Sequence, residues 1–120
     1  MTATQSFEVV EAGLQGAPGI AVRGAIDLDA VPFLEAALDA VIRDTAGAFV
    51  LDLCELEFLD SSGLRVMLRA RALLAREDRE LAIVCPPGSV RRLFALAGIA
   101  DLLFLYASRD EAAAALVATG

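Results

Sequence analysis

The chain has 120 residues, 58% of them apolar, which is enough for one domain with a hydrophobic core and too few residues for two. Its net charge of -7 disfavours nucleic acid as a partner, because contacts to phosphates require a concentrated basic surface. With no histidine and only two cysteines, the sequence lacks the usual general base of hydrolases and the ligands of a zinc site, so we expect no catalysis, no metal and no other cofactor.

The first half of the chain predicts a hairpin, a helix and a buried strand. Apolar residues alternate weakly from Phe7, and Ile20 to Ile26 forms a second apolar segment beyond the glycines of residues 13–19. Asp29 is expected to cap a helix, because helical spacing is shown by Val31, Leu34, Leu38, Val41 and Ile42. Phe49 to Leu53 is apolar except for one aspartate, as in a strand that is buried on both faces.

The second half predicts three more helices, separated by two strands. The first of these helices is expected after Asp60 and Ser61, with arginines along its outer side. The next elements are expected to be a strand at Leu81 to Cys85, a helix from Ser89 to Gly98 and a strand at Leu102 to Tyr106. Ser108 and Glu111 have the spacing of a capping box, which predicts the start of the last helix.

Strands that alternate with helices after an initial hairpin predict an α/β fold. We expect a mostly parallel five-stranded sheet with one antiparallel strand and about four helices, in a single domain over residues 1–120 with its core at about 7–118. No apolar run is long enough to cross a bilayer, and residues 1–10 lack the basic and apolar regions of a secretion signal. We therefore expect a cytoplasmic protein without a membrane segment.

The charges are unevenly distributed along the chain. Residues 1–60 contain eleven acidic residues and two arginines, whereas residues 61–120 contain six acidic residues and eight arginines. One short stretch holds five arginines, namely Arg65, Arg69, Arg71, Arg76 and Arg79. This stretch indicates either a solvated helix face or an electrostatic docking surface for another protein.

The segment Asp60-Ser61-Ser62-Gly63-Leu64 lies where a strand is expected to give way to a helix. Ser61 is placed to cap that helix through its side-chain oxygen. A helix N-terminus also accommodates phosphate, through its exposed amides and the positive end of its dipole. Because Asp, Ser and Gly are ordinary turn and cap residues, spacing alone does not separate a plain helix start from a phosphate-bearing site.

Three segments of the chain stand out together. They are Leu59-Asp60-Ser61-Ser62-Gly63-Leu64, Val22-Arg23-Gly24-Ala25-Ile26-Asp27 and the segment from Ser89 to Ile99. In this order they resemble the signature, the strand end and the third-helix segment of anti-sigma factor antagonists in the STAS domain family. The resemblance extends from about Phe7 to Leu116, which is far more specific than one short pattern, and it implies a single STAS-like domain.

The resemblance implies a partner switch. In such a switch the unphosphorylated protein binds an anti-sigma factor that is also a serine kinase, and thereby releases a sigma factor. It implies that Ser61 is phosphorylated, with Ser62 as the alternative, and that a serine phosphatase removes the phosphate. Together with the arginine stretch, it gives the expected partner-binding residues Asp27, Asp60, Ser62, Gly63, Leu64, Arg65 and Arg69.

Two residues depart from the family pattern, because Ala25 replaces the usual acid and Arg65 stands where a second glycine is frequent. Asp27 is equally well explained as a helix-entry residue. The alternative function is a non-catalytic STAS scaffold or an accessory subunit of a stress-sensing or transport complex.

Cys85 and Arg91 have the Cys-x5-Arg spacing of cysteine phosphatases and lie between an expected strand and helix. A phosphatase loop directs successive backbone N–H groups at the phosphate, and Pro86 and Pro87 have no N–H to donate. The phosphatase is therefore the weaker interpretation. We expect Cys54 and Cys85 to be reduced core thiols that the switch does not require.

Overall fold

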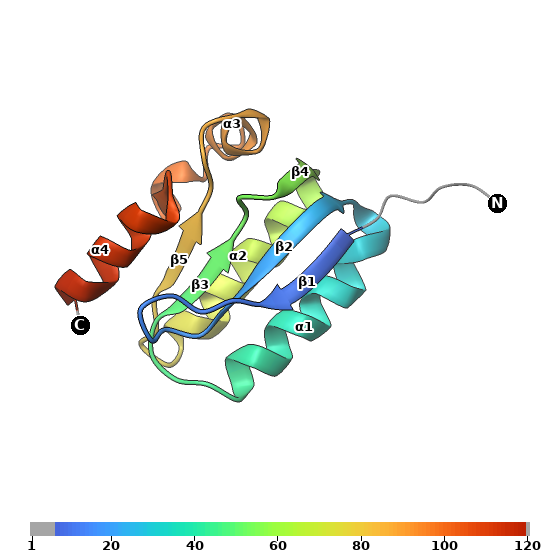
Figure 1. The fold of residues 1–120 in the computed structure, drawn as a ribbon. Helices are drawn as coiled ribbons and strands as arrows, with labels where there is room; N and C mark the ends of the chain where they lie inside the picture. Colours follow the sequence, from blue (N-terminus) through green and yellow to red (C-terminus); the bar gives the residue numbers. More distant parts are fainter. Residues whose placement is uncertain (1–6, 120) are drawn as a thin grey trace.

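Six strands form the sheet at the centre of the molecule (Figure 1). The computed structural model describes residues 7–119. Its strands are β1 (Phe7–Glu11), β2 (Gly19–Ile26), β3 (Phe49–Asp52), β4 (Leu56–Leu59), β5 (Leu81–Val84) and β6 (Phe104–Tyr106). The order is β1-β2-β3-β5-β6, with β4 paired to β2, and β1 is antiparallel to β2 while the other pairs of these strands are parallel. The predicted α/β fold and mostly parallel sheet are confirmed.

β4 is the strand that the sequence analysis did not predict, so the sheet has six strands and not five. β2 is long enough to pair with two short strands in succession, β3 along Gly19 to Ala21 and β4 along Gly24 to Ile26. Between them the Asp52 carboxylate accepts a hydrogen bond of 2.9 Å from the Cys54 N–H, which turns the chain at the end of β3. Four residues are too few for β4 to show a clear period in the sequence.

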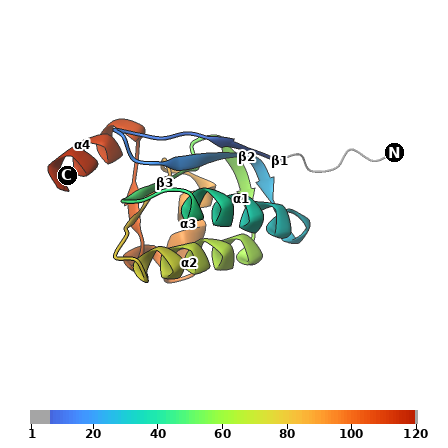
Figure 2. The same cartoon turned by 90° about the horizontal axis from the view of Figure 1, so that it is seen from below.

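Four helices flank the sheet, as predicted: α1 (Val31–Arg43), α2 (Ser61–Ala75), α3 (Ser89–Leu96) and α4 (Arg109–Thr119). In Figure 2, α1, α2 and α3 lie on one side of the sheet and α4 lies apart from them. The packing agrees, because Leu51 of β3 belongs to a large cluster with Leu34 of α1 and Met67 of α2, whereas Val50 packs with Ala112 of α4. Alternate residues of β3 thus enter two different clusters, which explains its continuous apolar sequence.

The start of α1 differs from the prediction. Asp29 does not cap α1, because Ala30 occupies that position without a side-chain hydrogen bond, and Asp27 caps the 3-10 turn (Leu28–Ala30) that precedes the helix. The Asp27 carboxylate accepts a hydrogen bond of 3.2 Å from the N–H of Ala30, at the end of that turn. The helical spacing placed the helix correctly, but it carries no information on an extra turn in front of it.

The starts of α3 and α4 bear on two further predictions. Gly88 occupies the cap position of α3, so Ser89 is the first helical residue and not the cap. At α4, the Ser108 hydroxyl accepts a hydrogen bond of 3.1 Å from the Glu111 N–H, which confirms that half of the capping box. None of the helices within residues 7–119 combines the length and the apolar character needed to cross a membrane.

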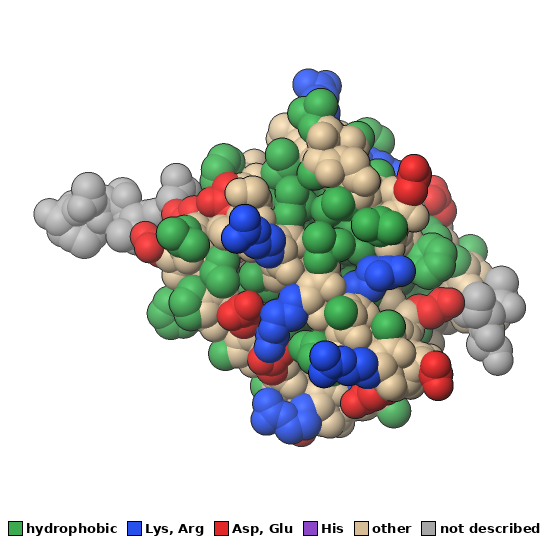
Figure 3. All heavy atoms as spheres, turned by 180° about the vertical axis from the view of Figure 1, so that it is seen from behind, with side chains coloured by type: hydrophobic (Ala, Val, Ile, Leu, Met, Phe, Trp, Pro, Cys, Tyr) green, Lys and Arg blue, Asp and Glu red, His purple; other side chains and the backbone are tan. Residues whose placement is uncertain are grey.

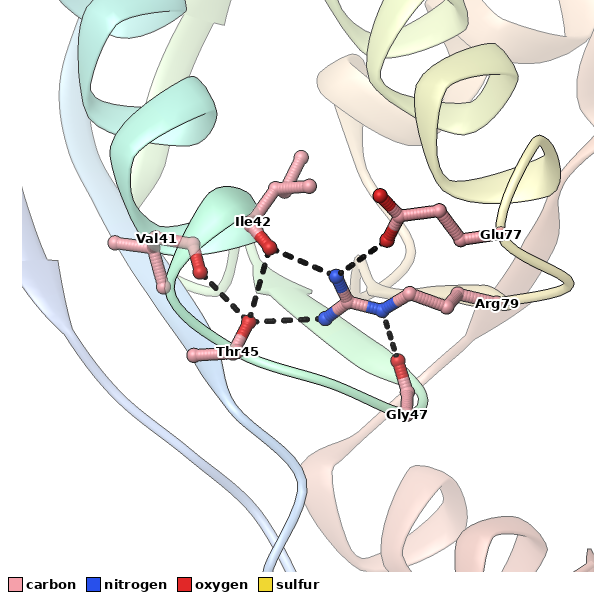
Figure 4. A network of polar contacts seen from close by, with 6 residues as sticks. All are labelled: Val41, Ile42, Thr45, Gly47, Glu77 and Arg79. Carbon is pink, nitrogen blue, oxygen red and sulfur yellow. Dashed lines mark hydrogen bonds and ion pairs between the residues drawn. The ribbon is translucent and has the colours of Figure 1, made fainter.

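Arg79 joins the end of α1 to the segment before β5 (Figure 4). Its guanidinium donates to the carbonyl oxygens of Gly47 at 2.6 Å and Ile42 at 2.8 Å, and to the Thr45 hydroxyl at 2.9 Å. Only 5% of the Arg79 side chain is exposed. Of the five clustered arginines, Arg79 is therefore a buried structural residue and contributes nothing to a docking surface.

Candidate functional site

The predicted site lies where β2 and β4 end side by side. Ile26 and Leu59 are partners in the parallel register, and the N–H of Asp60 donates to the carbonyl oxygen of Ile26 at 3.3 Å. Asp27 and Asp60 are the next residues of the two strands, so the structure brings these two predicted residues to the same edge of the sheet. Ser61 follows Asp60 as the first residue of α2 and is exposed.

Asp60, and not Ser61, caps α2. One oxygen of its carboxylate, Oδ1, accepts hydrogen bonds from the N–H groups of Ser62 at 3.0 Å and Gly63 at 3.2 Å. The same oxygen accepts a hydrogen bond from the Ser62 hydroxyl. The backbone of Asp60 is extended (φ -104°, ψ -175°), as a capping residue requires, whereas Ser61 is already helical.

These bonds set the ionisation of Asp60. Burial raises the pKa of the Asp60 carboxyl, but hydrogen bonds from the Ser62 hydroxyl and from the N–H groups of Gly63 and Ser62 outweigh it and hold the pKa below its usual value. The carboxylate is thus ionised at neutral pH. Ser62 is engaged with it, whereas within residues 7–119 the Ser61 hydroxyl has no hydrogen-bond partner.

Gly63 and Leu64 are buried, so among the predicted partner-binding residues these two face the core. A Cβ atom added at Gly63 would lie 2.2 Å from Leu59 Cδ1 and 3.0 Å from Ile26 Cγ2. Glycine therefore allows α2 to begin directly against the ends of β2 and β4. This close approach is what holds Asp60 and Ser61 at the surface beside Asp27.

Arg65 and Arg69 lie on the exposed side of α2. Several basic side chains, drawn blue, are exposed on the face shown in Figure 3. Arg69 is not free, because its two Nη atoms each lie 3.1 Å from a carboxylate oxygen of Asp39 in α1, and Glu35 is 4.0 Å away. Hydrogen bonding to Asp39 raises the pKa of Arg69. Within residues 7–119, Arg65 has no such partner. The predicted basic outer side of the helix is present, but one of its charges is neutralised.

Sequence reasoning missed two apolar side chains near this site. Leu28, in the 3-10 turn after Asp27, is 70% exposed, and Phe58, two residues before Asp60, is 49% exposed. Single exposed apolar side chains are common on protein surfaces, so it is the position of these two next to Asp27 and Asp60 in the chain that makes them of interest. The sequence contains only a weak sign of their exposure, namely that both residues lie outside the apolar periodicity of the neighbouring helices. The fold is needed to recognise it.

The Cys-x5-Arg segment does not have the chemistry of a phosphatase. Burial raises the pKa of the Cys85 thiol, and the opposing effect of Arg91 is smaller. Arg91 donates a 2.8 Å hydrogen bond to the carbonyl oxygen of Cys85, so its guanidinium is committed to the loop backbone. A phosphatase nucleophile requires a lowered thiol pKa and an arginine directed at the phosphate.

Both thiols are free, but only Cys85 is buried, so the prediction of a core position is wrong for Cys54. Partial desolvation of its sulfur and the neighbouring Asp52 carboxylate raise the pKa of Cys54 to about 12. Both thiols are consequently protonated at neutral pH. Within residues 7–119, no group of His, Cys, Asp and Glu side chains is arranged to hold a metal ion.

Comparison with known proteins gives the family. The model of the STAS domain matches residues 12–112. The anti-sigma-F factor antagonist RsfB of Mycobacterium tuberculosis is 30% identical over 112 residues, which are 93% of this chain and 91% of RsfB. An anti-sigma-B factor antagonist of Staphylococcus aureus is 30% identical over 84 residues, 70% of this chain and 78% of that protein. A crystal structure of an anti-sigma factor antagonist from Mycobacterium paratuberculosis has a TM-score of 0.85 at 31% identity and covers 96% of this chain and 97% of its own. Fold, motifs and relatives agree, and the chain belongs to the STAS domain family.

Proposed function

We propose that this protein is an anti-sigma factor antagonist and not an enzyme. In its unphosphorylated form it binds an anti-sigma factor that is also a serine kinase, and this releases a sigma factor in the cytoplasm. Phosphorylation of Ser61 ends the binding, and a serine phosphatase restores it. The observation that carries the proposal is the exposed Ser61 hydroxyl at the start of α2, which has no hydrogen-bond partner within residues 7–119 and follows the ionised Asp60 in the chain. The names of relatives that match over nine tenths of the chain support it.

The hydrogen bonds favour Ser61 over Ser62 as the phosphoacceptor. The Ser62 hydroxyl donates to the Asp60 carboxylate, and its backbone N–H donates to the same oxygen. A phosphate on Ser62 would replace that donor with negative charge beside Asp60 and would disturb the cap of α2. A phosphate on Ser61 leaves both hydrogen bonds in place.

The docking surface that we propose surrounds Ser61. It consists of Asp27, Asp60, the exposed apolar side chain of Leu28 and the cation Arg65. A phosphate adds a charge of about -1.5 to -2 at its centre. In a packed interface that charge is desolvated beside the carboxylates of Asp60 and Asp27, which commonly costs several kcal/mol of affinity. The switch therefore acts at the interface and leaves the fold intact.

Variants at the two serines test the proposal. We expect Ser61→Ala to bind the kinase without accepting phosphate, and Ser61→Asp to bind at least tenfold more weakly, which corresponds to about 1.4 kcal/mol. Ser61→Asp should melt near the wild-type temperature, because Ser61 is exposed and acids are tolerated in the first turn of a helix. Ser62→Ala is the matched control and should remain a substrate. The measurements are kinase-dependent phosphate incorporation, mapping by mass spectrometry, affinity and thermal denaturation.

Mapping of the phosphate by mass spectrometry distinguishes Ser61 from Ser62 as the acceptor, and the partner switch from the scaffold function. Phosphate on Ser62 with Ser61 unmodified would transfer the acceptor role to Ser62. Incorporation at neither serine with any co-encoded kinase, together with stable co-purification with other proteins, would favour a non-catalytic STAS scaffold or accessory subunit.

A further inference from the structure

We propose that Arg65 is the intramolecular partner of a phosphate on Ser61, so that phosphorylation also withdraws Arg65 from the docking surface. The inference rests on the proposed phosphorylation of Ser61 and adds a residue that responds to the modification. It is drawn from the positions of the two residues in α2 and from the partners that the surrounding charges already have.

Ser61 and Arg65 are both exposed and lie one helical turn apart in α2. At 3.6 residues per turn, positions i and i+4 differ by only about 40° around the helix axis. Their Cβ atoms are then about 5–6 Å apart. Helical side chains lean towards the N-terminus, so the long Arg65 side chain can reach back towards Ser61. An acid that precedes a base by four residues is also the favourable orientation of such a pair.

The neighbouring charges leave Arg65 available for this contact. Arg69, one turn further along α2, is held by Asp39 and by Glu35. Within residues 7–119, the structure gives the Arg65 side chain neither an ion pair nor a hydrogen bond. Of the two arginines on this side of α2 that lie closest to Ser61, Arg65 is thus both the nearer one and the one without a partner.

The amides that follow Ser61 in the first turn cannot take the place of Arg65. The N–H groups of Ser62 and Gly63 already donate to the Asp60 carboxylate. A phosphate on Ser61 would therefore lie next to the Asp60 carboxylate in the chain, with Asp27 at the end of the neighbouring strand, and the N–H groups of Ser62 and Gly63 could not offset their charges. A cation within one turn is the group that offsets this repulsion.

A guanidinium suits the task, because its planar pair of N–H donors matches two phosphate oxygens. A contact between the Ser61 phosphate and Arg65 changes the charge of the docking surface in two ways. The phosphate adds negative charge where the partner docks, and Arg65, once it is bound to the phosphate, no longer offers its positive charge to that partner. Phosphorylation thus weakens docking by adding a repulsive group and by withdrawing an attractive one.

Titration of the phosphate tests the contact directly. Phosphoserine is incorporated at position 61 of the full chain during translation, and the second ionisation of the phosphate is followed by ³¹P NMR. A bound guanidinium favours the dianion, so Arg65→Ala should raise the second pKa of the phosphate by about half a unit. Arg65→Lys should recover part of the difference. Arg71→Ala, which removes an exposed arginine from another side of α2, should titrate like the wild type.

Equal titration curves for the wild type and Arg65→Ala would overturn the inference, and so would an equal shift in Arg71→Ala, which would indicate only a long-range field. Thermal denaturation gives a second measure, because phosphorylation should lower the melting temperature more in Arg65→Ala than in the wild type. No kinase takes part in either measurement. Failure of the kinase to modify Ser61 would thus count against the proposed function alone, and unchanged titration with a working kinase would count against the role of Arg65 alone.

Discussion

Arg79 shows what a buried cation does in this fold. Its guanidinium donates to two backbone carbonyl oxygens and to the Thr45 hydroxyl at the end of α1, and its side chain is 5% exposed. Arg79→Ala would leave the carbonyl groups of Ile42 and Gly47 without these donors, which should lower the free energy of unfolding by about 2–4 kcal/mol. Urea denaturation measures the loss. The control is Arg76→Ala, which changes an exposed arginine and should stay within about 0.5 kcal/mol. Equal stability of the two variants would contradict the structural role of Arg79.

Asp52 and Arg109 form an ion pair between the end of β3 and the start of α4. Burial raises the pKa of Asp52, but hydrogen bonds from Cys54 and the contact with Arg109 outweigh it and lower the pKa. A carboxyl with a lowered folded-state pKa contributes stability that is complete above its ordinary pKa of about 3.9 and is lost as the pH falls through the folded value.

Arg109→Leu tests this pair through its pH dependence. Without the guanidinium, the Asp52 carboxylate keeps its burial cost and loses a partner, so the variant should be less stable by about 1–2 kcal/mol at pH 7. The difference should shrink as the pH falls and Asp52 becomes protonated. Arg23→Leu is the control, because Arg23 pairs with Glu8 at the surface and its loss should have little effect at either pH. A deficit in Arg109→Leu that does not depend on pH would show that packing, and not charge, connects α4 to β3.

At the level of elements, the close contact between α2 and β4 depends on Gly63. Helix propensity alone predicts that Gly63→Ala stabilises α2 by up to about 1 kcal/mol. The added Cβ would lie 2.2 Å from Leu59 Cδ1, however, so we expect the variant to be less stable by about 1–3 kcal/mol. Ser61→Ala, an exposed change in the same turn, should have an effect below about 0.5 kcal/mol. A gain in stability for Gly63→Ala in chemical denaturation would mean that β4 moves away easily.

Some features of the helices and strands can be predicted from the sequence, and others cannot. The hairpin, the four helices and the parallel strands follow from patterns that extend over many residues, and they were predicted correctly. β4 was missed because its four residues continue the pairing of β2 after a turn, which is a tertiary event. The tertiary positions of backbone groups determine whether Asp60 or Ser61 caps α2. They also determine the burial of Arg79. The motif at Asp60 to Leu64 located the site, but only the hydrogen bonds distinguish the engaged Ser62 from the unengaged Ser61.

At the level of the whole molecule, a protein with a net charge of -7 presents arginines along the outer side of α2 (Figure 3). Steering by such a surface depends on cations that internal partners have not neutralised. Arg69 is paired with Asp39 and Glu35, so reversal of its charge would also create repulsion between α1 and α2 and mix stability with binding. Arg65 is exposed and without a partner within residues 7–119, which makes it the cleaner position for a test.

Arg65→Glu should therefore slow association of the unphosphorylated protein with the kinase, by on the order of threefold at low salt. The effect should diminish near physiological salt, where the Debye length is about 8 Å. The matched control is Arg43→Glu, which makes the same change of charge at the last residue of α1, an exposed arginine whose side chain has no partner within residues 7–119. Stopped-flow association rates at several salt concentrations separate the two variants. If both variants slow association equally, the net charge governs the encounter, and if neither does, the basic side of α2 does not meet the partner. A selective effect of Arg65→Glu would place the partner across the first turns of α2, beside Ser61.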